Sequence, residues 1–440
     1  MFAFTIVWIG QVVSLLGSGM TMFALTIWAW EITGQATALA LVAFFSFGPS
    51  VVLSPLAGAL VDRWDRKLVM MLSDLAAGLM TIFVWVLYAS GSLEIWHLYV
   101  TGAISGAFQA FQFPAYSAAV TTMLPKEQYA RANGMLSLAE SAAGVFAPLA
   151  GGILLGFLGL SGILMIDVVT FVVAIGALLV VHVPQPEKTE AGREGQGSLW
   201  QESLYGFRYI LARPSLLGLQ LVFLAINLTA SFSFTVLAPM ILARTGNDEL
   251  VLGSVQSMMG VGGIVGGLLL SLWGGPRRRV HGVLLGMIFS SLLGEVILGL
   301  GAAPLAWSVG AFFVSFFIPV INGSNQAIWQ AKVAPDVQGR VFATRRLIAQ
   351  ISAPVAMLLA GPLADYFFEP AMAGQGTMSA LFGGLVGTGT GSGMALMFVV
   401  TGLLGVLVGL SGYLFPAVRN AEDILPDHDA EPLPAATQAV

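Results

Sequence analysis

The sequence has no cysteine: none of its 440 residues can form a disulfide bond, a thiolate metal site or a cysteine nucleophile. Charged residues are also scarce, at 9% of the chain, whereas hydrophobic residues account for 57%. Because a water-soluble protein carries roughly a quarter charged residues, this chain cannot bury its apolar surface in one soluble core. The composition therefore indicates an integral membrane protein.

Histidine is rare as well, and the motifs of common enzyme classes are missing. The 4 histidines are scattered along the chain, and neither H-E-x-x-H nor the phosphate-binding G-x-x-x-x-G-K occurs. We therefore expect no enzyme activity, no cofactor, no metal site and no nucleic-acid partner. Any work that the protein does would draw its energy from an ion gradient, because no ATPase module is present.

Long apolar stretches recur along the whole chain. A spanning helix needs about 20 mainly apolar residues. The run from Phe2 to Trp30 has no basic segment before it and is too long for a signal peptide, so we expect it to remain as the first span. The twelve predicted spans lie near residues 4–30, 36–61, 68–90, 95–122, 130–157, 160–183, 214–242, 250–274, 280–301, 305–332, 340–366 and 392–415.

The longest polar stretch divides these spans six and six. Residues 184–213 are rich in Pro, Gly, Glu and Gln, which is typical of a linker. An N-terminal half at 1–183 therefore precedes a C-terminal half at 214–416. The acidic segment 417–440 is expected to be a disordered tail.

The two halves resemble each other at a separation of about 210 residues. Aligning residues 123–154 with 332–364 places Pro125 on Pro335 and Gly151 on Gly361. Repeated halves of this kind are common in secondary transporters, whose substrate site lies between them near the bilayer midplane.

The basic residues indicate how the chain is oriented. If both termini are cytoplasmic, all of the 18 Lys and Arg residues except Arg244 lie in cytoplasmic loops or at the adjoining helix ends. Cytoplasmic loops of membrane proteins carry just such an excess of Lys and Arg. We therefore predict that both termini and the linker are cytoplasmic.

The segment GALVDRWDRK, residues 58–67, concentrates charge directly after an apolar run. It resembles the loop motif G-x-x-x-D-R-x-G-R-K of the major facilitator superfamily, with Asp65 where that family has glycine. The resemblance implies a cytoplasmic gate, in which the glycine allows close helix packing and the aspartate forms a latch near a helix N-terminus. Alternatively, the basic residues only set the topology and contact lipid headgroups. The matching residues are Gly58, Asp62, Arg63, Arg66 and Lys67.

This resemblance implies the major facilitator fold: an all-α integral membrane protein with twelve transmembrane helices in two pseudo-symmetric six-helix halves. The corresponding loop of the second half, LLLSLWGGPRRRV, keeps the glycines and three arginines but has no aspartate. We therefore expect the latch to be asymmetric.

A second motif lies in the fifth predicted span. It resembles the superfamily's antiporter motif G-x8-G-x3-G-P-x2-G-G, with alanine in place of two glycines, and implies proton-coupled export. Its small residues would pack against the glycine-rich span at 250–274. The alternative is the small-residue packing common to membrane helices. The matching residues are Gly134, Ala143, Ala147, Pro148, Gly151 and Gly152.

Two further stretches, FQFPAYSAAVTTMLPKEQYARANGM and LLAGPLADYFFEP, resemble the branch of macrolide-efflux, enterobactin-exporter and transmembrane secretion effector proteins. The resemblance implies a monomeric transporter in the bacterial inner membrane that exports amphipathic small molecules, with protons or another cation as the coupling ion. The span at 95–122 lacks the arginine that many proton-coupled drug exporters carry there. The alternative is a lipid-handling or uncoupled scaffold protein with the same fold.

Acidic residues inside the spans are candidates for proton coupling, because ionisable groups are costly in the membrane. Glu140 is the first candidate, since it lies about 15 Å along its helix, near the bilayer midplane. The alternative is a structural carboxylate paired with Arg345 or Arg346. Weaker candidates, each nearer a helix end, are Asp74, Asp167 and Glu295. Three other acids are expected at the outer surface: Glu31, Glu94 and Asp365.

Polar and aromatic side chains within the spans are candidates for a substrate cavity. Each alternatively serves helix packing. An aromatic cavity with few charges suits amphipathic substrates rather than sugars or phosphates. The candidates are Phe108, Gln109, Phe111, Gln112, Asn227, Phe232, Phe234, Asn322, Asn325 and Gln326.

Overall fold

The computed structural model describes residues 2–61, 64–124, 128–184, 206–333, 335–374 and 376–425, and within these ranges the regular structure is entirely helical. Of the predicted linker, residues 185–205 lie outside the described residues. A helical architecture follows from the composition, because a helix satisfies all its backbone hydrogen bonds within one segment.

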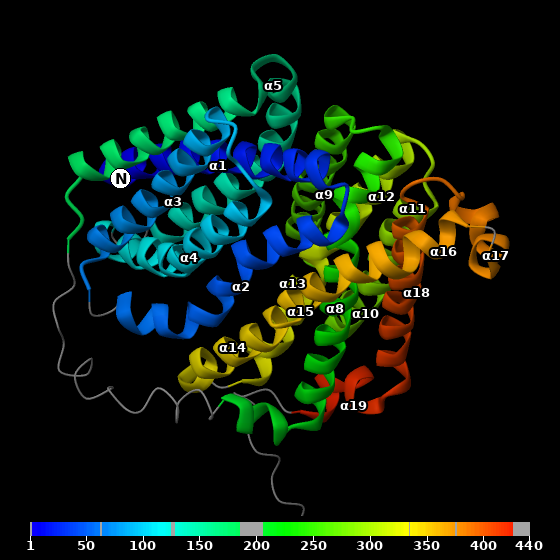
Figure 1. Ribbon diagram of the computed structural model, residues 1–440. Helices are drawn as coiled ribbons and strands as arrows, with labels where there is room; N and C mark the ends of the chain where they lie inside the picture. Colours follow the sequence, from blue (N-terminus) through cyan, green and yellow to red (C-terminus); the bar gives the residue numbers. More distant parts are fainter. Residues whose placement is uncertain are drawn as a thin grey trace, which may run out of the picture.

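The N-terminal half consists of long apolar helices. They are α1 (Phe2–Thr33), α2 (Ala36–Val61), α3 (Arg66–Ala89), α4 (Ile95–Met123) and α5 (Tyr129–Val180). The last of these folds back on itself at Gly159, where φ is 65° and ψ is 179° (Figure 1). Glycine allows this turn because it lacks the Cβ atom that makes a positive φ costly. The two arms of α5 correspond to the predicted fifth and sixth spans.

The C-terminal half is also helical but more segmented. Its elements are α8 (Pro214–Thr245), α9 (Glu249–Trp273), α10 (Arg279–Phe289), η2 (Ser290–Glu295), α11 (Val296–Leu300), α12 (Pro304–Phe316), α13 (Ile318–Lys332), α14 (Pro335–Gln350), α15 (Ser352–Leu363), η3 (Ala364–Phe368), α16 (Glu369–Ala373), α17 (Thr377–Val386), α18 (Ser392–Leu414), α19 (Pro416–Arg419) and α20 (Ala421–Ile424). The η elements are π-helical turns. Such turns insert an extra residue into an α-helix and are frequent at functional sites.

The described helices include 10 that are long and apolar enough to cross a membrane. One of them covers 138–180 and contains the turn at Gly159, and the less apolar α4 is not among them. The short apolar helix α17 was not expected from the sequence. These helices make the chain a multi-pass membrane protein, while the number of twelve crossings stays a prediction.

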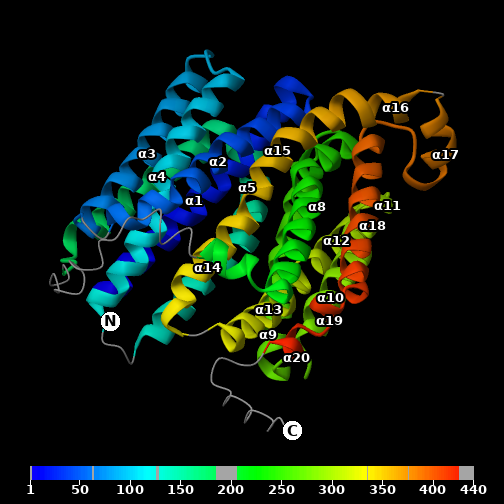
Figure 2. The same cartoon turned by 90° about the horizontal axis from the view of Figure 1, so that it is seen from below.

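The helices form two groups that meet along α2, α15, α5 and α9 (Figures 1 and 2). Figure 2 shows α19 and α20 at the same end of the bundle as the labelled N-terminus, and α16 and α17 at the opposite end. We call the first end, which the sequence predicts to be cytoplasmic, the inner end and the other the outer end.

Glycines allow the two groups to approach closely. A Cβ atom at Gly253 of α9 would lie 2.6 Å from the carbonyl oxygen of Pro148 in α5. A Cβ atom at Gly361 of α15 would lie 2.6 Å from Cα of Thr37 in α2. Both contacts are with backbone atoms, which cannot move aside as a flexible side chain can. The packing of the halves therefore requires glycine at both positions.

We predict that Gly253→Ala separates α9 from α5 and lowers the free energy of unfolding by about 1–3 kcal/mol, the usual cost of overpacking. The thermal melting temperature of the purified protein measures this effect. Gly176→Ala is the control, since a Cβ atom at Gly176 of α5 meets nothing within 4 Å. Equal melting temperatures for the two variants would contradict the prediction.

Candidate functional site

A cavity of ≈ 690 Å³ lies between the two halves. Its lining comes from α1, α2, α4 and α5 on one side and from α8, α9, α12, α13 and α15 on the other. Most of the lining side chains are apolar, among them Phe23, Phe47 and Phe234, while Gln109 and Gln256 add amide groups. A cavity of this size and character suits a small molecule that is mostly apolar with a few polar groups.

A second cavity of ≈ 450 Å³ adjoins the first and extends into the C-terminal half. Phe47, Phe234 and Met259 line both cavities, so the two share a wall. The second cavity also has polar lining, contributed by Asn227 and Glu295 among others. Of the described side chains that line the two cavities, Glu295 is the only acidic or basic one.

Glu295 is held at the junction of three helices. Ser233 of α8 donates a hydrogen bond of 2.8 Å from its hydroxyl to Oε2 of Glu295, and 2.6 Å separates the hydroxyls of Ser233 and Thr401 of α18. Glu295 is only 4% exposed. It is the last residue of η2, and a Cβ atom at Gly402 of α18 would lie 3.1 Å from its own Cβ. Close packing of α18 therefore fixes the carboxylate at the cavity wall.

The N-terminal half contains a similar cluster around Asp167. Oδ1 of Asp167, in the second arm of α5, accepts a 3.1 Å hydrogen bond from Ser18 of α1, and Oδ2 accepts a 3.0 Å bond from Thr81 of α3. In each half, the first predicted span thus supplies a serine, and the third and sixth spans supply one threonine and one acid between them. The acid stands on the sixth span in one half and on the third span in the other. Asp167 is 3% exposed and lines neither cavity.

Asp74 is part of a third polar cluster, between α1, α3 and α4. Its Oδ2 accepts a hydrogen bond of 2.8 Å from Gln11, and its Oδ1 accepts one of 2.8 Å from Gln112. Gln112 also donates to Oε1 of Gln11 at 3.3 Å. Two amides therefore hold this carboxylate within the N-terminal half, away from the residues that line the cavities.

The depth of Glu140 in its helix suggested a buried carboxylate, but the structure does not bury it. Glu140 is exposed, although the adjacent Ser141 lines the larger cavity. Arg345 donates a 2.8 Å hydrogen bond to Oε1 of Gln326, and its guanidinium carbon lies 5.2 Å from the ring centroid of Trp329. Among the described residues, no salt bridge joins Glu140 to an arginine. Depth along a helix fixes the level of a side chain but not the direction in which it faces.

Arg346 and the remaining polar candidates occupy different surroundings. Arg346 and Asn322 are exposed, whereas Asn325 is 1% exposed and its Oδ1 has no hydrogen-bond partner among the described residues. Of the predicted cavity residues, Gln109, Asn227 and Phe234 line one or both of the two cavities described above. Phe232 packs beside the main apolar core, and Phe111 stacks on Trp64 at 6.4 Å. The carbonyl of Phe108 accepts a hydrogen bond from Ser73.

The antiporter-like motif residues of α5 face both α1 and α9. A Cβ atom at Gly151 would lie 2.9 Å from the ring of Phe23, and one at Gly152 would lie 2.9 Å from the carbonyl oxygen of Glu249. Pro148 contacts Gly253 as described above, and Ala143 and Ala147 are buried in the same helix. Gly134 lies nearer the start of α5. The small residues thus form part of the seam between the halves.

That seam is supplemented at the outer end by Asp365, a residue of η3. Its Oδ1 accepts a hydrogen bond of 2.9 Å from the backbone N–H of Ala36, and its Oδ2 accepts one of 2.7 Å from that of Thr37. The side chain of Asp365, in the C-terminal half, therefore caps the first turn of α2 in the N-terminal half. Trp30 of α1 also donates to Oδ1 of Asn247 at 2.8 Å. We call the contacts of these five residues the outer latch.

The charged segment at 58–67 is described only in part. Asp62 and Arg63 lie outside the described residues, Gly58 belongs to α2, and Arg66 begins α3. Oδ1 of Asp65 accepts a 3.0 Å hydrogen bond from the backbone N–H of Leu68 and so caps α3. Lys67 donates to the carbonyl of Val181 at 2.8 Å. The aspartate that replaces the family's glycine therefore has a structural role of its own.

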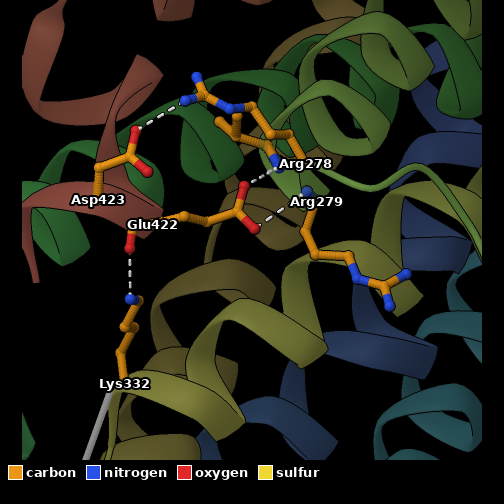
Figure 3. Close-up of polar contacts among 6 residues, drawn as sticks. Arg278, Arg279, Lys332, Glu422 and Asp423 are labelled. Atoms are coloured by element: carbon orange, nitrogen blue, oxygen red, sulfur yellow. Dashed lines mark hydrogen bonds and ion pairs between the residues drawn. The ribbon is translucent and has the colours of Figure 1, made fainter. Parts of the chain in front are cut away.

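The corresponding loop of the second half receives its acids from the C-terminal segment (Figure 3), and this contact corrects the expectation of a wholly disordered tail. Glu422 accepts hydrogen bonds of 3.1 and 2.9 Å from the backbone N–H groups of Arg279 and Val280 at the start of α10, and Asp423 pairs with Arg278 at 3.2 Å. Residues 416–425 are therefore ordered against the bundle rather than a disordered tail; 426–440 lie outside the described residues.

Lys332 at the end of α13 completes this arrangement. Its ammonium group donates to the backbone carbonyls of Glu422 and Leu425. The segment thus joins the inner ends of α10, α13 and α18. The carboxylates that the second-half loop lacks in sequence are supplied from more than 140 residues away, a relation that local spacing could not indicate.

The family of the chain follows from its sequence as well as its fold. A model of the Major Facilitator Superfamily matches residues 7–357, and the chain belongs to this superfamily of transporters. Macrolide efflux protein A of Streptococcus pyogenes is 27% identical over 378 residues, which cover 82% of this chain and 89% of that protein. The enterobactin exporter EntS of Escherichia coli is 24% identical over 419 residues, 93% of this chain and 92% of that protein.

Solved structures show the same fold at lower sequence identity. A bacterial homologue of the human lysosomal transporter Spinster, in an inward-facing and occupied conformation, is 14% identical and aligns with a TM-score of 0.68 over 94% of this chain and 96% of the other. A bacterial homologue of the iron transporter ferroportin is also 14% identical, with a TM-score of 0.65 over 93% and 98%. The present chain is thus a transporter of the superfamily, and several of its relatives are named for efflux.

We predict that Asp365→Ala opens the outer latch. Loss of a helix cap costs about 1 kcal/mol, which would shift the balance between conformations about fivefold towards the outward-open one. The chain has no cysteine, so Thr26→Cys, at the wall of the larger cavity, gives one labelling site. Labelling by an impermeant maleimide added outside right-side-out vesicles should increase. Glu94→Ala is the control, because Glu94 accepts its bond from Trp96 within its own half; equal labelling in both backgrounds would refute the latch.

For the C-terminal segment, we predict that Glu422→Gln lowers the melting temperature, because a neutral amide is a weaker acceptor for two N–H groups at a helix N-terminus. The expected loss is about 1 kcal/mol. Asp423→Asn is the matched control: its ion pair with Arg278 is 58% and 56% exposed, and exposed pairs contribute about 0–1 kcal/mol. A larger loss with Asp423→Asn than with Glu422→Gln would show that the cap is unimportant.

Proposed function

We propose that this transporter exports amphipathic small molecules by alternating access and that proton antiport drives it. The observation that carries the proposal is the apolar cavity between the halves, with a single carboxylate at the wall of the space that adjoins it. A mostly apolar lining lowers the cost of transferring an apolar molecule from the bilayer, and a few polar groups orient it. The efflux names of its relatives support the direction of transport.

Alternating access requires that the contacts between the halves change. The contacts of the outer latch and the close approach of Gly253 to Pro148 lie on the outer side of the cavity. Breaking them and forming others at the inner end would expose the cavity to the opposite side, with each half moving largely as one body. In this proposal the Gly58 to Lys67 segment and the ordered C-terminal segment act at the inner gate.

We also propose that the protein crosses the bacterial inner membrane twelve times with both termini in the cytoplasm and acts as a monomer. The distribution of basic residues supports the orientation. The two arms of α5 and the helix α4 supply the crossings beyond the more apolar described helices. The efflux-named relatives come from bacteria, which supports the location.

For coupling, we propose Glu295 as the first proton carrier among the four acids that the sequence nominates, of which Asp167 lines neither cavity. Glu295 lines the second cavity, Asp74 is bonded within the N-terminal half, and Glu140 is exposed. A carboxylate at a cavity wall can exchange its proton with the solvent whenever the cavity opens to one side. Alternating access then turns that exchange into movement of protons across the membrane.

This proposal predicts that everted vesicles containing the protein accumulate macrolides, dyes or siderophores when a proton gradient is imposed, and that nigericin abolishes the accumulation. Glu295→Gln should remove at least 90%, or about tenfold, of the gradient-driven part, because the side chain no longer titrates. Asp167→Asn is the control, since Asp167 lines neither cavity. Accumulation that ignores the gradient, or none for any compound, would instead favour an uncoupled or lipid-handling protein.

A further inference from the structure

Among the described residues, Glu295 has no positively charged partner. The hydroxyl of Ser233 is its hydrogen-bond donor, and the salt bridge found among the described residues is elsewhere, between Arg278 and Asp423. A hydroxyl can orient a carboxylate but cannot neutralise its charge. An unpaired charge in an apolar interior is costly, so the carboxyl group requires either a proton or an external cation.

The helices that pack against η2 do not provide a counter-charge either. On α8 the basic residue is Arg244, which donates to the carbonyls of Gly301 and Val386 at the outer end. On α10, His281 forms a 2.9 Å hydrogen bond with Tyr413 of α18, and Arg279 bonds to the carbonyl of Gly274. The helices α11, α12 and α18 have no charged side chain.

The cavity wall around Glu295 is well suited to a cation with an apolar body. Phe47, Phe234 and Phe398 line the same cavity, and aromatic faces attract cations as well as apolar groups. Asn227 and Ser231 add uncharged polar groups. With its neighbour, the cavity provides ≈ 450 and ≈ 690 Å³, enough for a drug-sized molecule with its charged group at one end.

We propose that Glu295 binds the positively charged group of an amphipathic organic cation, and that this cation and a proton exclude each other at the carboxylate. When the cation enters, the Glu295 carboxylic acid releases its proton to the solvent and the carboxylate pairs with the cation. When the cation leaves, one proton returns to the same oxygen. The inference rests on the proposed export function and adds to it a substrate class and a residue that selects that class.

The Asp167 cluster provides an internal comparison. It has the same chemistry as the Glu295 cluster, with hydroxyl donors from two neighbouring helices and an acid that is 3% exposed. It lacks only the cavity. If burial among hydroxyls were sufficient, both acids would affect cation binding. If access to the cavity decides, only Glu295 will do so.

The test is equilibrium binding to the purified full-length protein in detergent, with tetraphenylphosphonium as the cation and chloramphenicol as an uncharged aromatic probe. Glu295→Gln should weaken tetraphenylphosphonium binding at least tenfold, or about 1.4 kcal/mol, and change chloramphenicol binding less than about twofold. Asp167→Asn should leave both affinities unchanged. Melting temperatures of the variants identify any loss that comes from unfolding, and Glu295→Asp, which keeps the charge, should recover part of the cation affinity.

A pH series provides a second measurement that a purely structural residue would not change. In the wild-type protein, tetraphenylphosphonium affinity should fall by up to about tenfold for each unit by which the pH is lowered, over the range in which the proton occupies Glu295. The reason is that the two ligands are linked through one site. The affinity should be independent of pH in Glu295→Gln, and binding at a weakly buffered pH should release protons in the wild type alone.

Three results would overturn the inference: wild-type cation affinity in Glu295→Gln, equal losses in Asp167→Asn and Glu295→Gln, or pH-independent cation binding in the wild type. Failure of the proposed function has a different signature, because everted vesicles with the wild-type protein would then accumulate no compound of the panel, charged or uncharged. Export of uncharged compounds together with any of the three results above would remove the cation site and leave the transporter function in place.

Discussion

The cost of burying a charged group among apolar helices governs the positions of the polar residues in this protein. Four acids in the helical bundle, Asp74, Asp167, Glu295 and Asp365, are bonded to hydroxyls, amides or backbone N–H groups contributed by neighbouring helices. Each such bond needs helices that pack closely enough to reach the same carboxylate. The polar clusters and the small residues that bring the helices together therefore depend on each other.

Two of these acids stand where the helix is π-helical. Glu295 ends η2 and faces the second cavity, whereas Asp365 lies in η3 and caps the first turn of α2 across the seam between the halves. The extra residue in a π-helical turn changes the direction of the side chains that follow it. One acid is thereby placed at the cavity and the other at the contact that holds the halves together at the outer end.

The two halves are alike in plan but solve the same local problem differently. At the inner end, α3 is capped by Asp65, three residues ahead of Leu68 in the sequence. The equivalent helix α10 is capped by Glu422 from the C-terminal segment (Figure 3). Within the polar clusters, the acid and the threonine exchange helices between the halves. A repeat can keep its architecture while its polar contacts are redistributed, because each contact needs only a donor and an acceptor at the right place.

Composition and residue spacing were enough to determine the helical membrane architecture and the family of this protein. Apolar stretches of spanning length, the split into two halves and the motif from Gly58 to Lys67 are local properties of the sequence, and the family match agrees with them. Hydrophobic length decides where helices form regardless of their neighbours. The sequence also nominated Gln109, Asn227 and Glu295, since polar residues in apolar helices are conspicuous.

Only the tertiary structure decided which nominated residues line the cavity, which are exposed and which bond to one another. Glu140 was favoured for its depth yet is exposed, and Gln112 bonds to Asp74 instead of lining the cavity. Asp365 caps α2 from 329 positions away in the sequence, and Glu422 caps α10 from 143 positions away. The rotation of each helix about its own axis, its π-helical turns and its distant partners are set by packing across the whole bundle, which the local spacing of residues does not contain.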